Sequence, residues 1–110
     1  MNQRRILVIG SLNADLVQNV QRVPNPGETI EGSELQMFCG GKGANQACAA
    51  ALLGGTVSMA GMVGADAFGS RLQSELRTAG VDVGRVGTSE KSTGVATIFI
   101  LPSGENLIVL

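Results

Sequence analysis

Short apolar runs alternate along the chain with segments whose apolar residues recur at helical spacing. The first run, Ile6–Gly10, is β-branched and ends in Gly-Ser, which predicts a buried, parallel strand. Residues 95–101 alternate between two faces, and the turn residues Pro102–Glu105 then predict a hairpin. The segments that predict strands are residues 6–10, 16–20, 29–38, 57–63, 85–87, 95–101 and 107–110.

Two segments carry the apolar spacing of a helix. The stripe of the first is Ala44, Ala47, Cys48, Ala51 and Leu52, ending at Gly54–Gly55. The stripe of the second is Phe68, Leu72, Leu76 and Ala79, after a capping Asp66 and before Gly80. Strands that alternate with helices predict right-handed βαβ units and hence an α/β fold with a layered parallel sheet.

The remaining strands predict a smaller sheet outside that layer. The chain ends within an apolar strand at Leu110, whereas a native terminus is more often polar and frayed. We therefore expect a truncated domain.

The composition excludes several classes of protein. Only 15% of the residues are charged and the net charge is −1, so the basic stripe of a nucleic-acid-binding protein is missing. The chain has no histidine, which excludes Ser-His-Asp catalysis and imidazole-based zinc sites. No apolar run is long enough to span a bilayer and no signal-peptide pattern is present, so we expect a cytoplasmic protein without membrane or nucleic-acid partners.

A glycine-rich segment, Cys39–Gln46, opens the first predicted helix. Its backbone N–H groups would converge where the helix dipole is positive, which suits an anion or an oxygen-rich ligand. It is not a Walker A loop, because Gln36 stands at the first glycine position, and Gln46 breaks the dinucleotide fingerprint. The alternative is that these glycines only let the helix approach the sheet.

Asn13 and Asp15 follow the first strand, where ligands of open α/β sheets bind. A carboxylate can accept hydrogen bonds from two neighbouring hydroxyls, and an amide offers both a donor and an acceptor. These residues therefore fit a polyol ligand. The alternative is turn formation, because Asn and Asp often bond to their own backbone after a strand.

Five ordered blocks together resemble the amino-terminal third of the ribokinase-like carbohydrate kinases. They are Gly10–Asp15, Pro26–Thr29, Gly40–Ala47, Gly61–Gly69 and Ser92–Ala96. The resemblance implies a ribokinase-like α/β domain, incomplete in this chain, with a small β-sheet lid. It places the lid strands at about residues 16–38 and 93–110 and the ATP-binding part beyond this chain.

The resemblance also implies which residues bind the substrate. Those expected to bind sugar hydroxyls are Asn13, Asp15, Lys42, Asn45 and the backbone of Gly41. Those expected to present apolar lid surface to the sugar ring are Ala96, Ile98 and Leu110. For Ala96 and Ile98 the alternative is plain sheet packing, because alternation by itself predicts a buried face.

The implied activity is phosphoryl transfer from ATP to a primary sugar hydroxyl: D-ribose would give ribose 5-phosphate, with deoxyribose or fructose as other candidate sugars. The resemblance further implies Mg²⁺, a monovalent cation (K⁺) and a homodimer formed through the β lid.

The family's catalytic aspartate lies in a distal D-T-x-G-A-G-D motif that this chain lacks, and Gly64–Asp66 does not replace it. We expect no catalytic, nucleotide-binding or metal-binding residues in this segment, and no activity from it alone. The alternative is a truncated, non-catalytic module that binds sugar or dimerises.

Overall fold

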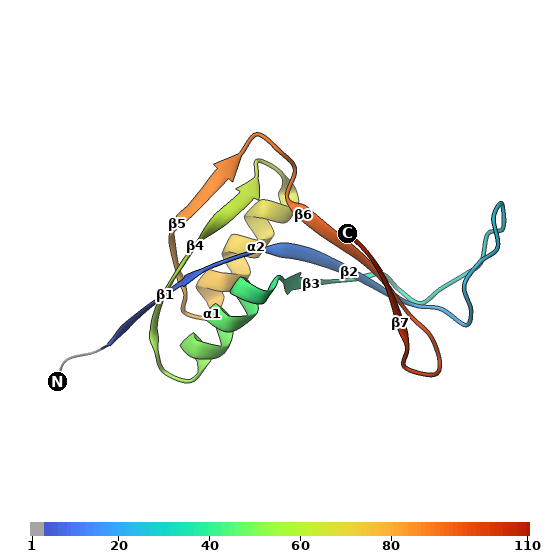
Figure 1. The fold of residues 1–110 in the computed structure, drawn as a ribbon, viewed down its shortest axis with the longest axis horizontal. Coiled ribbons are helices and arrows are strands. Elements are labelled where there is room, and N and C mark those ends of the chain that lie inside the picture. The colour runs from blue at the N-terminus through green and yellow to red at the C-terminus, as the bar shows by residue number, and fades with distance from the viewer. Residues whose placement is uncertain (1–3) are drawn as a thin grey trace. The chain divides into compact units, whose positions relative to one another are not determined.

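The structure is a computed structural model that describes residues 4–110 (Figure 1). It contains β1 (Arg5–Ile9), β2 (Asn13–Asn19), β3 (Gln36–Gly40), α1 (Lys42–Leu52), β4 (Thr56–Gly64), α2 (Ala67–Thr78), β5 (Asp82–Ser89), β6 (Gly94–Ile100) and β7 (Asn106–Val109). The chain divides into two compact units. The first comprises the chain up to Ala14 together with Cys39–Gly94, and the second comprises Asp15–Phe38 and Val95–Leu110.

The first unit is built on a parallel sheet with the strand order β1-β4-β5. Helices α1 and α2 connect successive neighbours in this order, so two right-handed crossovers place both on one face. The core lies between this face and the helices, where Met59, Leu72 and Leu76 are fully buried. The predicted α/β architecture is confirmed.

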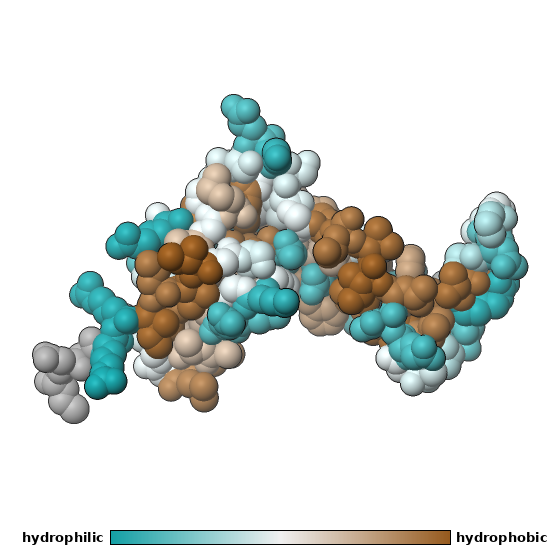
Figure 2. All heavy atoms as spheres, viewed as in Figure 1, coloured by the Kyte–Doolittle hydropathy of each residue, from teal (hydrophilic) through white to brown (hydrophobic). Residues whose placement is uncertain are grey.

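The opposite face of this sheet is not covered by any helix of the unit. Leu7, Ile9 and Met62 are respectively 51%, 78% and 57% exposed, and hydrophobic atoms are visible beside β1 in Figure 2. The prediction that residues 6–10 form a buried strand is therefore wrong as to burial, although the strand itself is present and parallel. Its apolar run is that of a strand covered on both faces, but β1 is an edge strand covered on one.

Local signals set the limits of both helices. Asp66 caps α2 by accepting a hydrogen bond from Gly69 N, and the chain turns away at Gly80 with φ of +93°. Helix α1 buries Ala44 and Ala47 and ends before Gly54, where φ is +95°. Leu52, predicted to lie on the buried stripe of α1, is instead 75% exposed; it is the last residue of the helix.

The second unit holds most of a four-stranded sheet with the order β3-β2-β6-β7. Strands β6 and β7 form the predicted antiparallel hairpin, with Ile98 opposite Ile108. Two backbone hydrogen bonds, from Leu101 N to Glu105 O and from Gly104 N to Leu101 O, close its turn.

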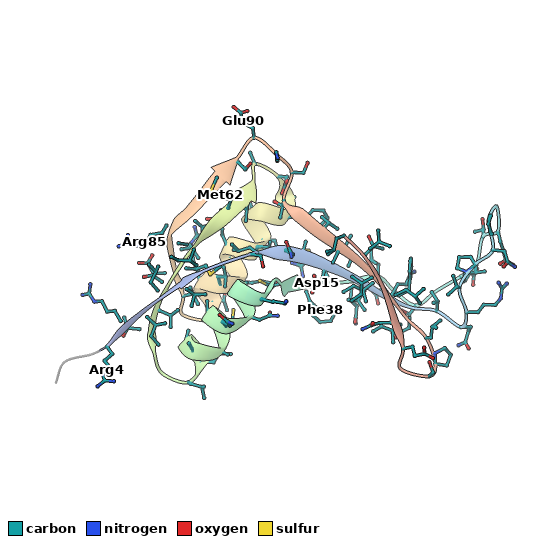
Figure 3. The ribbon with its side chains drawn as sticks, viewed as in Figure 1. Arg4, Asp15, Phe38, Met62, Arg85 and Glu90 are labelled. Atoms are coloured by element: carbon teal, nitrogen blue, oxygen red, sulfur yellow. The ribbon has the colours of Figure 1, made fainter. Side chains whose placement is uncertain are left out.

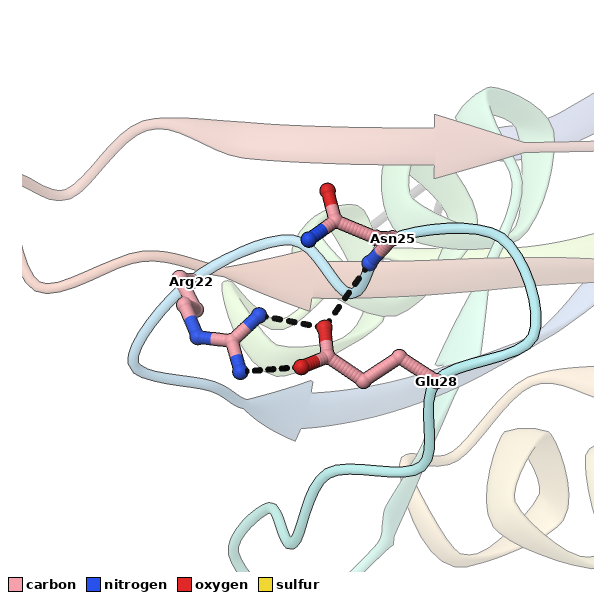
Figure 4. Close-up of polar contacts among 3 residues, drawn as sticks. All are labelled: Arg22, Asn25 and Glu28. Carbon is pink, nitrogen blue, oxygen red and sulfur yellow. Dashed lines mark hydrogen bonds and ion pairs between the residues drawn. The ribbon is translucent and has the colours of Figure 1, made fainter.

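The loop between β2 and β3 is held by side chains rather than by strand pairing. The Arg22 guanidinium donates two parallel hydrogen bonds to the Glu28 carboxylate, which also accepts from the Asn25 backbone N–H (Figure 4). The Arg22 partner lowers the pKa of Glu28. The predicted extended segment 29–38 forms a strand only from Gln36 onward.

Candidate functional site

An open pocket of about 610 Å³ lies at the carboxyl ends of β1 and β4, within the first unit. Its lining is Ile9, Gly10, Ser11, Leu12, Asn13, Ala60, Gly61, Met62 and Gly94. Met62 projects from β4 in Figure 3. Ligands of open α/β sheets bind at this edge, so the pocket is the natural candidate site of this unit.

Helix α1 begins beside the chain segment that follows β1. Gly41 has φ of +96°, and a Cβ added there would lie 2.5 Å from Ser11 O, so only glycine fits. Ser11 O accepts a hydrogen bond from Ala44 N. No side chain caps α1, and in the described chain no hydrogen bond is recorded for the N–H groups of Lys42 and Gly43. These two donors stand at the positive end of the helix dipole.

Gly43 permits the close approach of α1 to the sheet. A Cβ added at Gly43 would lie 2.8 Å from backbone atoms of Gly10 and 2.9 Å from Cε of Met59. The packing role weighed for these glycines is therefore confirmed at Gly43. It does not exclude ligand binding, because close packing and open N–H groups occur together at this helix start.

Asn13 and Asp15 lie in strand β2, not in a turn. They are two positions apart, so their side chains project from the same face of the strand. Neither forms a side-chain hydrogen bond to its own backbone in the described chain, so the turn-forming alternative is wrong. Partial burial raises the pKa of Asp15, whose carboxylate is labelled in Figure 3. A half-buried carboxylate without a compensating cation costs free energy that a ligand can recover.

Lys42 and Asn45 are exposed in the first turn of α1. Within the described part of the first unit, neither side chain takes part in a hydrogen bond or ion pair. The fold therefore does not use these two polar groups.

The two apolar candidates lie in β6. Ala96 is buried at 4% exposure and Ile98 is half-buried opposite Ile108. Plain sheet packing accounts for the burial of Ala96. Leu110 follows the last strand and is 92% exposed.

A second polar cluster joins the start of α2 to the loop before β6. Asp66 Oδ1 accepts hydrogen bonds from Gly69 N at 2.8 Å and from Thr93 Oγ1 at 2.6 Å. Asp66 Oδ2 accepts from Thr93 N, and Thr93 Oγ1 accepts from Gly64 N, both at 2.9 Å. The Thr93 side chain is the chief cause of the lowered pKa of Asp66.

Among residues 4–110, no group of three or more carboxylate, thiol or imidazole side chains is arranged to hold a metal ion. The described helices, α1 and α2, also lack the length and apolar run needed to cross a membrane.

The family model described as pfkB family carbohydrate kinase matches residues 3–110. The chain belongs to this family. The family resemblance seen in the sequence is therefore confirmed, and the glycine-rich start of α1 is one of the blocks that carry it.

Curated relatives of this pfkB chain include ribokinases from bacteria and yeast. It is 41% identical over 109 residues to the ribokinase of Haemophilus influenzae, covering 98% of this chain and 36% of that protein. It is 48% identical over 112 residues to the ribokinase of Schizosaccharomyces pombe, covering 96% and 35% respectively. A deoxyribokinase of Salmonella typhimurium is 40% identical over 109 residues, with 96% and 35% covered. The chain thus spans about a third of the length of these relatives.

Solved structures agree with the family fold. The Arabidopsis thaliana ribokinase complexed with ribose and ATP matches with a TM-score of 0.86 and 34% identity, over 99% of this chain and 36% of that one. The Cryptococcus neoformans ribokinase in complex with ADP matches with a TM-score of 0.80 and 41% identity, over 96% and 33%.

The sequence pattern assigns no individual role to Thr93 or Gly94. Thr93 bonds to Asp66 from 27 positions away, so no local pattern announces the contact. A signal was present in the block Ser92–Ala96, where a glycine follows a threonine directly before a β-branched strand.

Proposed function

We propose that this pfkB chain is the sugar-binding part of a ribokinase, which in the intact protein phosphorylates D-ribose to ribose 5-phosphate with ATP. The observation that carries the proposal is the set of polar groups that the fold leaves unused. Asn13 and the start of α1 offer donors and acceptors without partners in their unit, and Asp15 offers a half-buried carboxylate. Ribokinases at 41% and 48% identity support ribose as the substrate.

In this proposal the polar residues form hydrogen bonds to the sugar hydroxyls and the apolar residues contact the sugar ring. The Asp15 carboxylate accepts hydrogen bonds from two neighbouring sugar hydroxyls, and the Asn13 amide both donates and accepts. Lys42 and Asn45, with the backbone at Gly41, donate to further sugar oxygens. Ala96 and Ile98 present apolar surface to the ring.

Phosphoryl transfer also needs a base, a nucleotide site and cations, and we place all of them outside this chain. Asp66 is a poor candidate for the base, because its carboxylate already accepts three hydrogen bonds from Gly69 and Thr93. Among residues 4–110 no three or more carboxylate, thiol or imidazole side chains gather to hold a metal ion such as Mg²⁺. ATP use is supported by the nucleotide complexes among the matched ribokinases. The 110-residue chain by itself is therefore expected to be inactive.

The second sheet would act as the sugar lid and as the contact of a homodimer, and the protein would be cytoplasmic. These parts of the proposal rest on the resemblance and the composition. A kinase for 2-deoxyribose is a second candidate, favoured by the deoxyribokinase that is 40% identical. A non-catalytic module that binds sugar or dimerises is the third candidate, and it would bind ribose without turnover.

A coupled kinase assay tests the proposal on the intact gene product and, in parallel, on the 110-residue chain. D-ribose, 2-deoxyribose and fructose are each supplied with Mg-ATP. We expect the intact protein to phosphorylate ribose with the highest kcat/KM and the 110-residue chain to show no turnover. Preference for 2-deoxyribose or fructose contradicts the proposed substrate, and turnover by the short chain contradicts the placement of the base.

A further inference from the structure

The amide of Asn13 lies close to the backbone of Gly94. In the described part of the first unit it forms no hydrogen bond. A Cβ added at Gly94 would lie 2.5 Å from Asn13 Oδ1 and 3.4 Å from Asn13 Cγ. Both residues line the same pocket. The Asn13 amide therefore lies against the Gly94 backbone, and a shift of that backbone would change the space open to the amide.

Gly94 is fixed in turn by its neighbour Thr93. Thr93 is 4% exposed, and both its backbone N–H and its hydroxyl donate to the Asp66 carboxylate. The same hydroxyl accepts from Gly64 N. With one backbone and two side-chain hydrogen bonds, the residue before Gly94 has little freedom to move.

The hydrogen-bonded contact between Asp66 and Thr93, called the clamp below, can form because the neighbouring positions are glycines. A Cβ added at Gly64 would lie 2.5 Å from Thr93 N and 2.6 Å from Asp66 Oδ2. One added at Gly69 would collide with Gly64 O and lie 3.1 Å from Thr93 Oγ1. The start of α2 and the loop before β6 can therefore meet only because these positions lack side chains.

We propose that Asp66 and Thr93 are positioning residues, which hold Gly94 against Asn13 and thereby fix the orientation of the Asn13 amide for the sugar. This inference rests on the proposed function. It assigns a role in substrate recognition to residues that do not themselves line the pocket.

The first test replaces Thr93 in the intact gene product and measures D-ribose affinity by calorimetry, well below the melting temperature. Thr93→Val keeps the shape but removes the hydroxyl, and we expect roughly tenfold weaker ribose binding. Thr93→Ser restores the hydroxyl and should recover most of the affinity. Thr88→Val, an exposed threonine of β5, is the matched control and should leave affinity unchanged. Wild-type affinity in folded Thr93→Val overturns the proposal.

A second variant reaches the same contact without disturbing the clamp. Gly94→Ala places a methyl group against Asn13 and should weaken ribose binding by a similar factor, roughly tenfold. Gly84→Ala is its control, because there the new methyl group meets only the exposed carboxylate of Asp82, at 3.1 Å. If Gly94→Ala binds ribose as tightly as the control does, the contact does not position Asn13.

A double-mutant cycle separates positioning from a general loss of structure. If Thr93 acts through Asn13, Thr93→Val should cause no further loss of ribose affinity in an Asn13→Ala background. Additive losses instead assign Thr93 a purely structural role. The KM for ATP should be unchanged in every variant.

The Asn13 side-chain amide signals in an NMR spectrum test the clamp without sugar. We expect them to shift in Thr93→Val and to keep their positions in Thr88→Val. A wild-type protein that does not bind ribose refutes the proposed function, while these shifts still decide whether the clamp positions Asn13. Unshifted signals overturn the positioning role.

Discussion

The two helices of the first unit begin in opposite ways. Helix α2 starts with a capping aspartate, Asp66, whose oxygens accept from Gly69 N and from the backbone and side chain of Thr93. Helix α1 starts at Gly41 without any side-chain cap. Both starts are glycine-rich, yet the start of α2 is closed by the fold, whereas the start of α1 leaves backbone N–H groups without partners in the described part of its unit.

Two carboxylates show the same contrast through their pKa values. Hydrogen bonds from Thr93 and Gly69 lower the pKa of Asp66, whereas burial raises the pKa of Asp15. A carboxylate whose bonds are all made within the fold stabilises that fold. One that is partly desolvated without such bonds is poised for a ligand. Unused polar groups therefore distinguish the proposed site at the start of α1 from the start of α2, which glycine content does not.

The largest expected effect concerns the close contact at the start of α1. Gly43→Ala brings a Cβ within 2.8 Å of the Gly10 backbone, which cannot yield as a flexible side chain would. We expect a loss of about 3 kcal/mol in the free energy of unfolding, typical of overpacking against backbone. Urea denaturation measures it, with Gly84→Ala as control. A loss below about 1 kcal/mol contradicts the packing role of Gly43.

The next effect concerns the closed start of α2. Thr93→Val leaves the N–H of Gly64 without its acceptor in a buried setting. We expect the free energy of unfolding to fall by about 2 kcal/mol, the usual cost of an unsatisfied buried group. Thr93→Ser should lose less than about 1 kcal/mol, because only a methyl group is removed. A loss in Thr93→Ser as large as that in Thr93→Val would contradict the hydroxyl as the main source of this stabilisation.

A smaller effect, on ribose affinity, is expected from replacing Asp15. Asp15→Ala should weaken D-ribose binding by about 1–2 kcal/mol in the intact protein, because sugar hydroxyls lose their acceptor. Stability should not fall, since a desolvated charge is removed. Calorimetry and thermal melting measure the two quantities. Asp82→Ala, an exposed carboxylate in β5, should leave ribose affinity unchanged.

The smallest effect is a difference in acid stability. The folded pKa of Asp66 lies below its ordinary value of 3.8, so its contribution is fully present above that pH. It is lost as the pH falls through the folded pKa. The ionised Asp15 carboxylate has the opposite effect on stability: burial raises its pKa, so its ionised form is unfavourable in the fold.

Unfolding curves of wild type and Asp66→Asn between neutral pH and strongly acidic pH test this difference. The gap in stability between the two proteins should narrow on acidification below 3.8. A gap that stays constant with pH would show that Asp66 does not stabilise the fold through its ionised form.

The elements with local signals could be predicted from the sequence. The Asp66 cap and the terminal Gly80 delimit α2, and Gly54 follows the end of α1. The burial of β1 could not be predicted, because it depends on which elements cover the sheet. Residues 29–35 form no strand. Ser33 is held instead by Gln18 Nε2, which donates to Ser33 O, and by the Asn19 backbone, which donates to Ser33 Oγ and accepts from Ser33 N.

The types of the candidate site residues and their places in the fold could be predicted from the sequence. Asn13 and Asp15 follow the first strand, and the glycine-rich segment opens α1, as the sequence suggested. The contacts of Thr93 could not be anticipated, because its partners lie 27 and 29 positions away.

An NMR titration of the intact protein with D-ribose tests the central claim most directly. We predict that ribose shifts the backbone amide signals of Lys42 and Gly43 and the side-chain amide signals of Asn13 and Asn45. The amide signal of Gly69, already bound to Asp66, should stay in place. Shifts at Gly69 with silent signals at the start of α1 would contradict the account.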